Sequence, residues 1–217
     1  KKLEETGANA LKQYDIQSPE QIVPILVEGY RLAKDPEWST RLPGPGAFLL
    51  QKRNEYLAAL RLAAGIQVDA ISDRETAVNG ETLNVNARVF YPQNSAILVT
   101  SVVIRTPESW AVTPAAPVST PAAQGPGRRE NPNFGLAFSV KVSDSAAPTQ
   151  PYWLERPRQG DLFNWTIGME RTFPLGRPAV TAEVALTVNG TELLIEQLVE
   201  FRYADDIRGE IRRPLVV

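Results

Sequence analysis

The chain has 217 residues, of which 43% are hydrophobic and 22% charged, and its formal net charge is −2. This composition is typical of a folded globular protein and excludes a general nucleic-acid binder, whose contact surface would be strongly basic. Histidine and cysteine are both absent, which excludes disulfides, a Ser-His-Asp triad, a cysteine nucleophile and a histidine base, and argues strongly against zinc. We therefore predict no catalytic residue, no metal site and no cofactor in this chain.

The sequence contains no membrane-spanning segment and no recognisable export signal. No apolar run approaches the roughly 20 residues that a membrane span needs, and no signal peptide is visible. The chain starts at Lys1 without a methionine and stops on the apolar residues 214–217. We interpret it as a piece of a longer protein, so the missing signal peptide says little about the compartment.

Residues 1–65 are predicted to form a helical segment of about three helices. One apolar face at helical spacing consists of Leu3, Ala10, Leu11 and Tyr14. Ser18 is expected to cap a second helix, with Gln21 completing a capping box. Pro24 is expected to kink that helix, because proline removes an interior hydrogen bond. A third helix is predicted from about Ala47 to Ala64, with Gly65 as its stop.

After Gly65 the apolar period changes from helical to two, which indicates strands. The predicted strands lie at 82–89, 97–104, 134–142, 180–188 and 193–201. Asn189-Gly190 joins the last two as the clearest hairpin in the sequence. One-sided strands separated by turns predict an antiparallel β-sandwich or barrel, and we favour a single sandwich over residues 66–217, with Trp110 closing one end of its core.

Two proline-rich stretches are predicted to interrupt these elements. Residues 113–133 are rich in proline, alanine and glycine, and we interpret them as a long surface loop between strands. Trp38 lies beside the second stretch, 42–46, and is expected to dock the helices on another surface.

The stretch 149–165 concentrates aromatic side chains. Tyr152, Trp153, Phe163 and Trp165, flanked by charges such as Arg156, are the residue types that a sugar-binding face needs. Large aromatic residues more often fill a core, and we favour that interpretation. Tyr152, Trp153, Trp165 and Arg156 remain the candidate ligand-binding residues.

Charged residues offer weaker candidates. The carboxylates that could act in acid–base chemistry are Asp144, Glu155, Asp161, Asp205, Asp206 and Glu210. Solvated turns are the favoured interpretation, and a calcium site at Asp205-Asp206 is the alternative. Arg208, Arg212 and Arg213 could bind phosphate or carboxylate, but paired charges on an outward strand face are favoured.

Three pieces of the sequence together resemble a known family. They are residues 62–66 (LAAGI), residues 150–154 (QPYWL), and residues 202–205 (RYAD) followed by 208–215 (RGEIRRPL). In that order they resemble the region downstream of the catalytic domain in large bacterial proteins of the LmbE/PIG-L deacetylase family. In this resemblance the QPYWL piece begins a sandwich strand, with Tyr152 and Leu154 on one face and Trp153 on the other.

The resemblance implies a helical segment followed by an immunoglobulin-like β-sandwich, of the kind that accompanies carbohydrate-active enzymes. The family's catalytic domain is a zinc-binding α/β unit with an Ala-His-Pro-Asp-Asp motif, which this histidine-free chain lacks. No catalytic residue therefore transfers. What the resemblance implies is an exported, non-catalytic accessory region of a sugar-processing protein. Its expected partners are the missing catalytic domain and, in the alternative of a carbohydrate-binding module, a polysaccharide.

Overall fold

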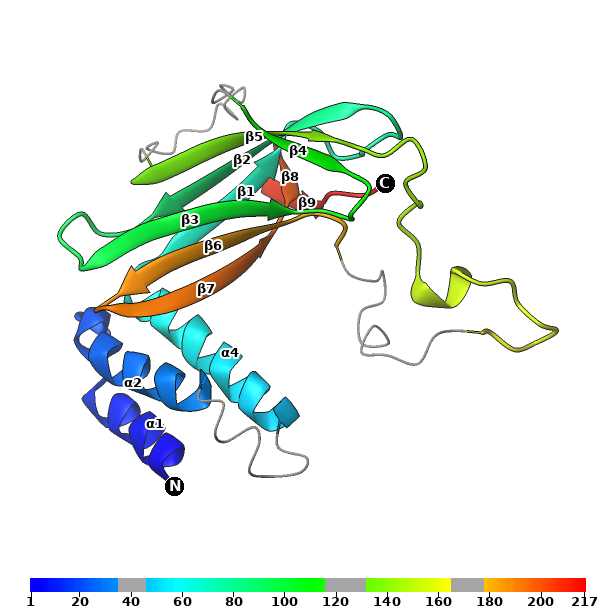
Figure 1. The fold of residues 1–217 in the computed structure, drawn as a ribbon. Helices are drawn as coiled ribbons and strands as arrows, with labels where there is room; N and C mark the ends of the chain where they lie inside the picture. The colour runs from blue at the N-terminus through cyan, green and yellow to red at the C-terminus, as the bar shows by residue number, and fades with distance from the viewer. Residues whose placement is uncertain (35–45, 116–131, 165–177) are drawn as a thin grey trace.

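The structure, a computed structural model, describes residues 1–34, 46–115, 132–164 and 178–217. Figure 1 shows two layers of strands and a group of helices at the end of the molecule where β6 and β7 meet. The elements in chain order are α1 (Lys2–Gln13), η1 (Pro19–Ile22), α2 (Val23–Lys34), α4 (Gly46–Ala63), β1 (Gln67–Ser72), β2 (Thr82–Phe90), β3 (Ile97–Arg105), β4 (Ala111–Ala115), β5 (Phe134–Lys141), η2 (Tyr152–Leu154), β6 (Thr181–Val188), β7 (Thr191–Leu198), β8 (Glu200–Asp205) and β9 (Gly209–Pro214).

The strands form two facing sheets, as the sequence predicts. One sheet has the order β4-β5-β2-β1-β8-β9 and the other has the order β3-β6-β7. The first seven strands thus follow the arrangement of a constant-type immunoglobulin domain, which places strands one, two, five and four in one sheet and three, six and seven in the other. The β8–β9 hairpin extends the larger sheet, and among the named strands only its junction with β1 is parallel. The predicted strand 193–201 is wrong in its bounds, because the chain changes sheet at Val199: β7 ends at Leu198 in the smaller sheet and β8 begins at Glu200 in the larger one. The mainly β, immunoglobulin-like prediction is confirmed.

Alternation along the strands builds the core between the sheets. In β2, the side chains of Leu83, Val85, Ala87 and Val89 are fully buried, whereas those of the residues between them point to the other face. Trp110 is also buried in this core, as predicted. Buried residues of the helices and of both sheets belong to one continuous cluster. The boundary at residues 65/66 marks the change from helix to strand, and its status as a domain boundary stays a prediction.

Glycines set the turns at two of the predicted positions. Asn189 and Gly190 both have positive φ, 48° and 75°, which makes the β6–β7 turn type I′. Gly65 (φ 66°) ends α4. Its N–H donates to the carbonyl of Leu62, and the N–H of Ile66 donates to that of Arg61, which is the Schellman arrangement.

Two predictions about the second helix are wrong. Pro24 is the second residue of α2 and causes no interior break, because the first turn of a helix has no partner for that N–H anyway. Ser18 makes no side-chain cap. Its carbonyl instead accepts a hydrogen bond from the backbone N–H of Gln21 at 3.2 Å, within a short 3₁₀ turn that leads into α2.

The first helix is less buried than its pattern predicts. Ala10 is buried against the other helices, but Leu11 is 79% exposed and Tyr14 is half exposed. Tyr30 of α2 is buried in the same apolar cluster as Leu186 of β6 and Leu193 of β7. Burial raises the pKa of Tyr30, and a backbone hydrogen bond at Leu194 of β7 opposes the rise. None of the described helices is long and apolar enough to cross a membrane.

The predicted loop over 113–133 begins too early. Its first three residues, 113–115, belong to β4, which pairs with β5 at the edge of the larger sheet. Pro114 fits there because an edge strand can leave one backbone position without a donor. Residues 116–131 lie outside the described part of the chain, as do Trp38 and the stretch 42–45.

Candidate functional site

A segment after β5 extends away from the two sheets. We call residues 143–164 the projecting segment; it is the yellow-green chain on the right of Figure 1. Thr149 anchors it, because its N–H donates to the carbonyl of Val217 at 3.0 Å and its hydroxyl accepts from the N–H of Val217 at 2.9 Å. Between Pro151 and Leu162, the described backbone hydrogen bonds stay within the segment. The segment is therefore tied to the body at its start and is otherwise held by short local turns.

The first of these turns lies where a sandwich strand was expected, so that prediction is wrong. Tyr152–Leu154 form the 3₁₀ helix η2, closed by a hydrogen bond of 2.9 Å from the N–H of Leu154 to the carbonyl of Pro151. Two physical facts oppose a strand here. Pro151 has no N–H to continue the ladder that Thr149 begins, and Val217 already occupies the position beside Thr149. The expected alternation of Tyr152 and Leu154 against Trp153 is consequently absent.

The candidate ligand-binding residues are only partly brought together. The rings of Tyr152 and Trp153 meet edge to face, with centroids 4.9 Å apart and planes at 88°. Both are half-buried, whereas Arg156 is fully on the surface. Trp165 lies outside the described residues. What the structure places together is the aromatic pair Tyr152–Trp153.

Aliphatic and aromatic side chains remain uncovered along the same segment. Leu154 is 52% exposed, Leu162 is 72% exposed and Phe163 is 41% exposed. Leu162 sits in a tight turn in which its backbone and that of Gln159 exchange hydrogen bonds of 3.0 and 3.1 Å. A turn built this way holds its apolar side chain toward solvent, where hydration of apolar surface is unfavourable.

The carboxylates lie mainly in turns. Asp205 accepts hydrogen bonds from the backbone N–H groups of Arg208 (2.8 Å) and Ile207 (3.0 Å) in the β8–β9 turn, and these bonds lower its pKa. Glu210 pairs with Arg212. The remaining candidates Asp144, Glu155, Asp161 and Asp206 are on the surface. Among the described residues, no three acidic groups gather closely enough to hold a metal ion, so the calcium alternative at Asp205-Asp206 gains no support.

The arginines near the C-terminus are mostly paired with carboxylates of the protein itself. Arg213 is 2.8 Å from Glu75 and lies over the ring of Tyr203. Arg212 donates to Asp69 at 3.0 Å and to Glu210 at 2.8 Å. Burial lowers the pKa of Arg212, but these hydrogen bonds outweigh it and raise the pKa overall.

The third arginine of the run, Arg208, is exposed and lies in the β8–β9 turn, where its backbone N–H donates a hydrogen bond to the Asp205 carboxylate. A phosphate or carboxylate ligand would have to displace the protein's own carboxylates from Arg212 and Arg213. The paired-charge interpretation is therefore the one that the geometry favours for those two.

One buried carboxylate, that of Asp69, was not among the candidates predicted from the sequence. Asp69 of β1 is only 3% exposed and accepts from Arg212 and, at 3.4 Å, from Arg202. On the neighbouring strand Asn86 is buried too, and among the described residues its Nδ2 has no hydrogen-bond partner. The signal that could have found Asp69 is its position as a charged residue within the mainly apolar stretch 66–71, because such a residue needs a partner.

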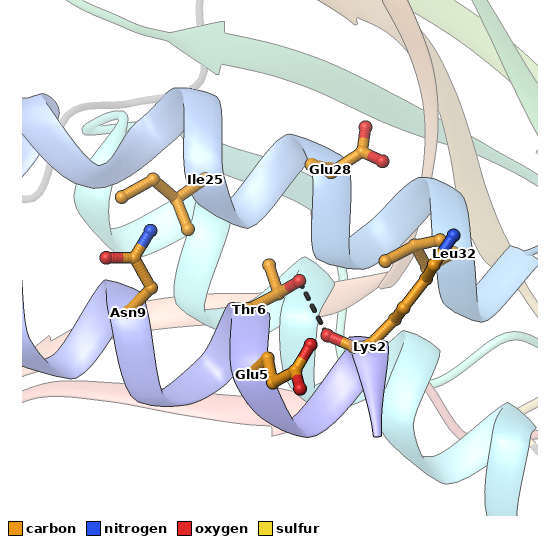
Figure 2. Close-up of a pocket in the computed structure, with 7 residues that line it drawn as sticks. All are labelled: Lys2, Glu5, Thr6, Asn9, Ile25, Glu28 and Leu32. Carbon is orange, nitrogen blue, oxygen red and sulfur yellow. Dashed lines mark hydrogen bonds between the residues drawn. The ribbon is translucent and has the colours of Figure 1, made fainter.

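The helices carry two open furrows. The first lies between α1 and α2 and is drawn in Figure 2, with polar side chains from α1 facing Ile25, Glu28 and Leu32 of α2. The hydroxyl of Thr6 there donates to the carbonyl of Lys2 at 2.9 Å, so part of the polar lining is satisfied internally.

The second furrow lies between α1 and α4. It has an apolar floor that includes Leu3 and Tyr56. The Lys52–Glu55 ion pair stands at its rim, 2.8 Å apart. Neither furrow encloses a set of convergent polar groups of the kind that fixes a small ligand.

Comparison with known proteins adds no identification. No protein-family profile matches the chain, and no match was found among the curated proteins or the solved structures.

Proposed function

We propose that this chain is a non-catalytic accessory domain that binds a neighbouring protein domain through the projecting segment. The observation that carries the proposal is the exposure of Leu154, Leu162 and Phe163 on one extended segment. Exposed apolar side chains on a segment outside the core are candidates for contact with another protein surface. The resemblance to the region downstream of LmbE/PIG-L deacetylase domains supplies the expected partner, a catalytic domain of the same polypeptide, and with it export from the cell.

Charge and geometry support binding rather than catalysis. Several candidate charged groups are already bound to other groups of the protein. Asp205 accepts hydrogen bonds from the backbone of its turn, and Arg213 pairs with Glu75. A general acid or base needs a free proton-transfer group beside a site that can hold the substrate. The described residues offer open furrows between helices instead.

Hydrogen exchange would test the proposal. The coding sequence upstream of Lys1 is read first, since an Ala-His-Pro-Asp-Asp motif there would supply the family context. Exchange is then compared at residues 143–164 in this chain alone and in the full-length polypeptide. Protection of at least about tenfold in the full-length protein is expected, because contact removes amide groups from water.

A variant makes the test specific. Leu162→Asp combined with Phe163→Asp should abolish the protection, whereas Leu62→Asp, at an equally exposed leucine of α4, should leave it intact. Equal exchange at 143–164 in the two proteins would refute the proposed contact, whatever the upstream sequence contains.

A carbohydrate-binding module is the second candidate, supported by the half-exposed Tyr152–Trp153 pair. Sugar rings stack on flat aromatic faces, and two rings at 88° cannot stack on the same sugar ring together. The indole of Trp153 is the larger of the two rings and is therefore the one chosen for the test. A tryptophan-fluorescence titration with N-acetylglucosamine oligomers separates the candidates: a saturable shift that Trp153→Ala removes favours the module, and no shift at millimolar sugar favours the protein contact.

A further inference from the structure

β3 is an edge strand in the described part of the chain. It pairs with β6 over its whole length, from Ile97 opposite Val188 to Arg105 opposite Thr181. No described strand lies on its other side, since the sheet has the order β3-β6-β7. The free side of an edge strand carries unpaired N–H and C=O groups that can pair with another chain.

Over most of its length, β3 lacks the charges and prolines that the other edge strands carry. The outer strands of the larger sheet contain Pro114 (β4) and Arg212, Arg213 and Pro214 (β9), and β7 carries Glu192 and Glu196. From Ile97 to Ile104, β3 has neither a charge nor a proline. Its only charge, Arg105, is held by Glu183 at 2.8 Å. Edge strands without charge or proline are suited to strand addition.

A bulge fixes where an antiparallel copy of this edge can be centred. Val99 pairs with Leu186 and Ser101 with Ala185, so Thr100 is an extra residue in β3. From 97 to 104 the side chains are buried, exposed, buried, exposed, exposed, buried, exposed and buried. This order reads the same in both directions from its centre between Thr100 and Ser101. In a regular strand the same match needs an axis that passes through a residue.

We propose that two copies of this chain pair antiparallel through β3, around a two-fold axis between Thr100 and Ser101. Leu98 then lies opposite Val103 of the second copy, and Val99 lies opposite Val102, so exposed residues meet exposed ones and core residues meet core ones. Leu98 is 64% exposed and Val103 is 39% exposed in the single chain. Pairing covers both and yields one continuous six-stranded sheet.

A second copy fits this edge better than a charged peptide does. The edge is neutral from 97 to 104, so two copies meet without like-charge repulsion, and every directly opposed pair falls on the same face, as antiparallel pairing requires. A single strand pair buries less surface than the standard interface, so the dimer is expected to be weak, with a Kd on the order of micromolar.

Sedimentation equilibrium over a concentration series tests the dimer and its register. The two substituted positions are exposed, so folding is expected to persist and is checked by circular dichroism. L98K/V103K places lysine opposite lysine twice and should weaken dimerisation at least about tenfold. L98K/V103E places lysine opposite glutamate twice and should restore it. A parent chain that stays monomeric to about 1 mM, or two double variants with the same Kd, would overturn the proposal.

Crosslinking gives a second readout that does not depend on those variants. The chain has no cysteine, so Ser101→Cys introduces a single thiol next to the proposed axis, within reach of its counterpart across the strands. Mild oxidation should give a disulfide-linked dimer much faster than in Leu194→Cys, which carries an exposed thiol on β7 of the same sheet. Equal crosslinking rates for the two variants contradict pairing through β3.

Discussion

Gly29 of α2 lies directly under the ring of Tyr56 of α4. A β-carbon at Gly29 would be 2.0 Å from Cε1 of Tyr56, well inside van der Waals contact. The hydroxyl of the same tyrosine donates to the carbonyl of Leu3 in α1 at 2.7 Å. The Tyr56 side chain thus connects α1, α2 and α4, and its close approach to α2 depends on a residue without a side chain.

Gly29→Ala is expected to destabilise the protein by about 1–3 kcal/mol, because the added methyl group must displace a buried ring. Urea unfolding followed by circular dichroism measures the change. Gly7→Ala is a milder comparison at the same tyrosine, since its β-carbon would lie 3.2 Å from the Tyr56 hydroxyl, which need move by only a few tenths of an ångström, and alanine favours a helix interior by up to about 1 kcal/mol. A Gly29→Ala protein as stable as the parent would contradict this packing.

Tyr56→Phe should cost about 1 kcal/mol at neutral pH, the typical net value of a lost hydrogen bond, and should alter the response to alkali. Burial raises the pKa of Tyr56 above its ordinary 10.0, with Lys52 opposing the rise. The neutral hydroxyl therefore favours the folded state, and that contribution is present below pH 10 and lost as pH rises through the folded-state pKa.

The measurement for Tyr56 is the free energy of unfolding of parent and variant between pH 7 and about 11. The advantage of the parent should be constant up to about pH 9 and should then shrink, since phenylalanine cannot ionise. An advantage that grows above pH 10 would contradict the direction assigned to the pKa.

Asp69→Asn is expected to lower stability by about 1–3 kcal/mol, because it removes charge-assisted hydrogen bonds from a buried carboxylate to Arg202 and Arg212. Chemical denaturation again provides the measurement. Glu75→Gln breaks the more exposed pair with Arg213 and should cost under about 1 kcal/mol. Equal losses for the two variants would mean that burial does not strengthen the Asp69 cluster.

Gly190→Ala should destabilise the β6–β7 hairpin by about 1–2 kcal/mol, since alanine is strained at the positive φ of 75° found there. Gly135→Ala in β5 is the control, because the nearest atoms to its added β-carbon are 3.8 Å away. Thermal unfolding should show a lower midpoint for the first variant alone. If both variants shift the midpoint equally, the turn conformation is not the cause.

Local patterns predicted most of the elements because they reflect a single face or a single turn. The alternation of Leu83, Val85, Ala87 and Val89 identified β2, since a half-buried strand needs that period whatever its neighbours are. Asn189-Gly190 identified the hairpin because few other residues adopt its two positive φ angles. The same reasoning failed at Pro24, where position within the first turn matters more than the residue type.

The candidate site depended on contacts between distant residues, which no local pattern encodes. Aromatic content marked the stretch 149–165, but Val217, nearly 70 positions from Thr149, occupies the place of the expected strand neighbour. Arg212 was recognised as a cation, whereas its carboxylate partner Asp69 lies 143 positions earlier.

The sequence by itself determined the helical segment, five of the strands, the mainly β sandwich class and the absence of histidine and cysteine, because these follow from composition and from short-range periodicity. The immunoglobulin-like expectation came from the family resemblance. Only the tertiary structure decided which strands end a sheet, which charges neutralise one another and which apolar side chains stay uncovered. Those properties depend on the packing of segments that are far apart in the chain, and pairing of the free edge of β3 with a second copy is the outcome that this packing predicts.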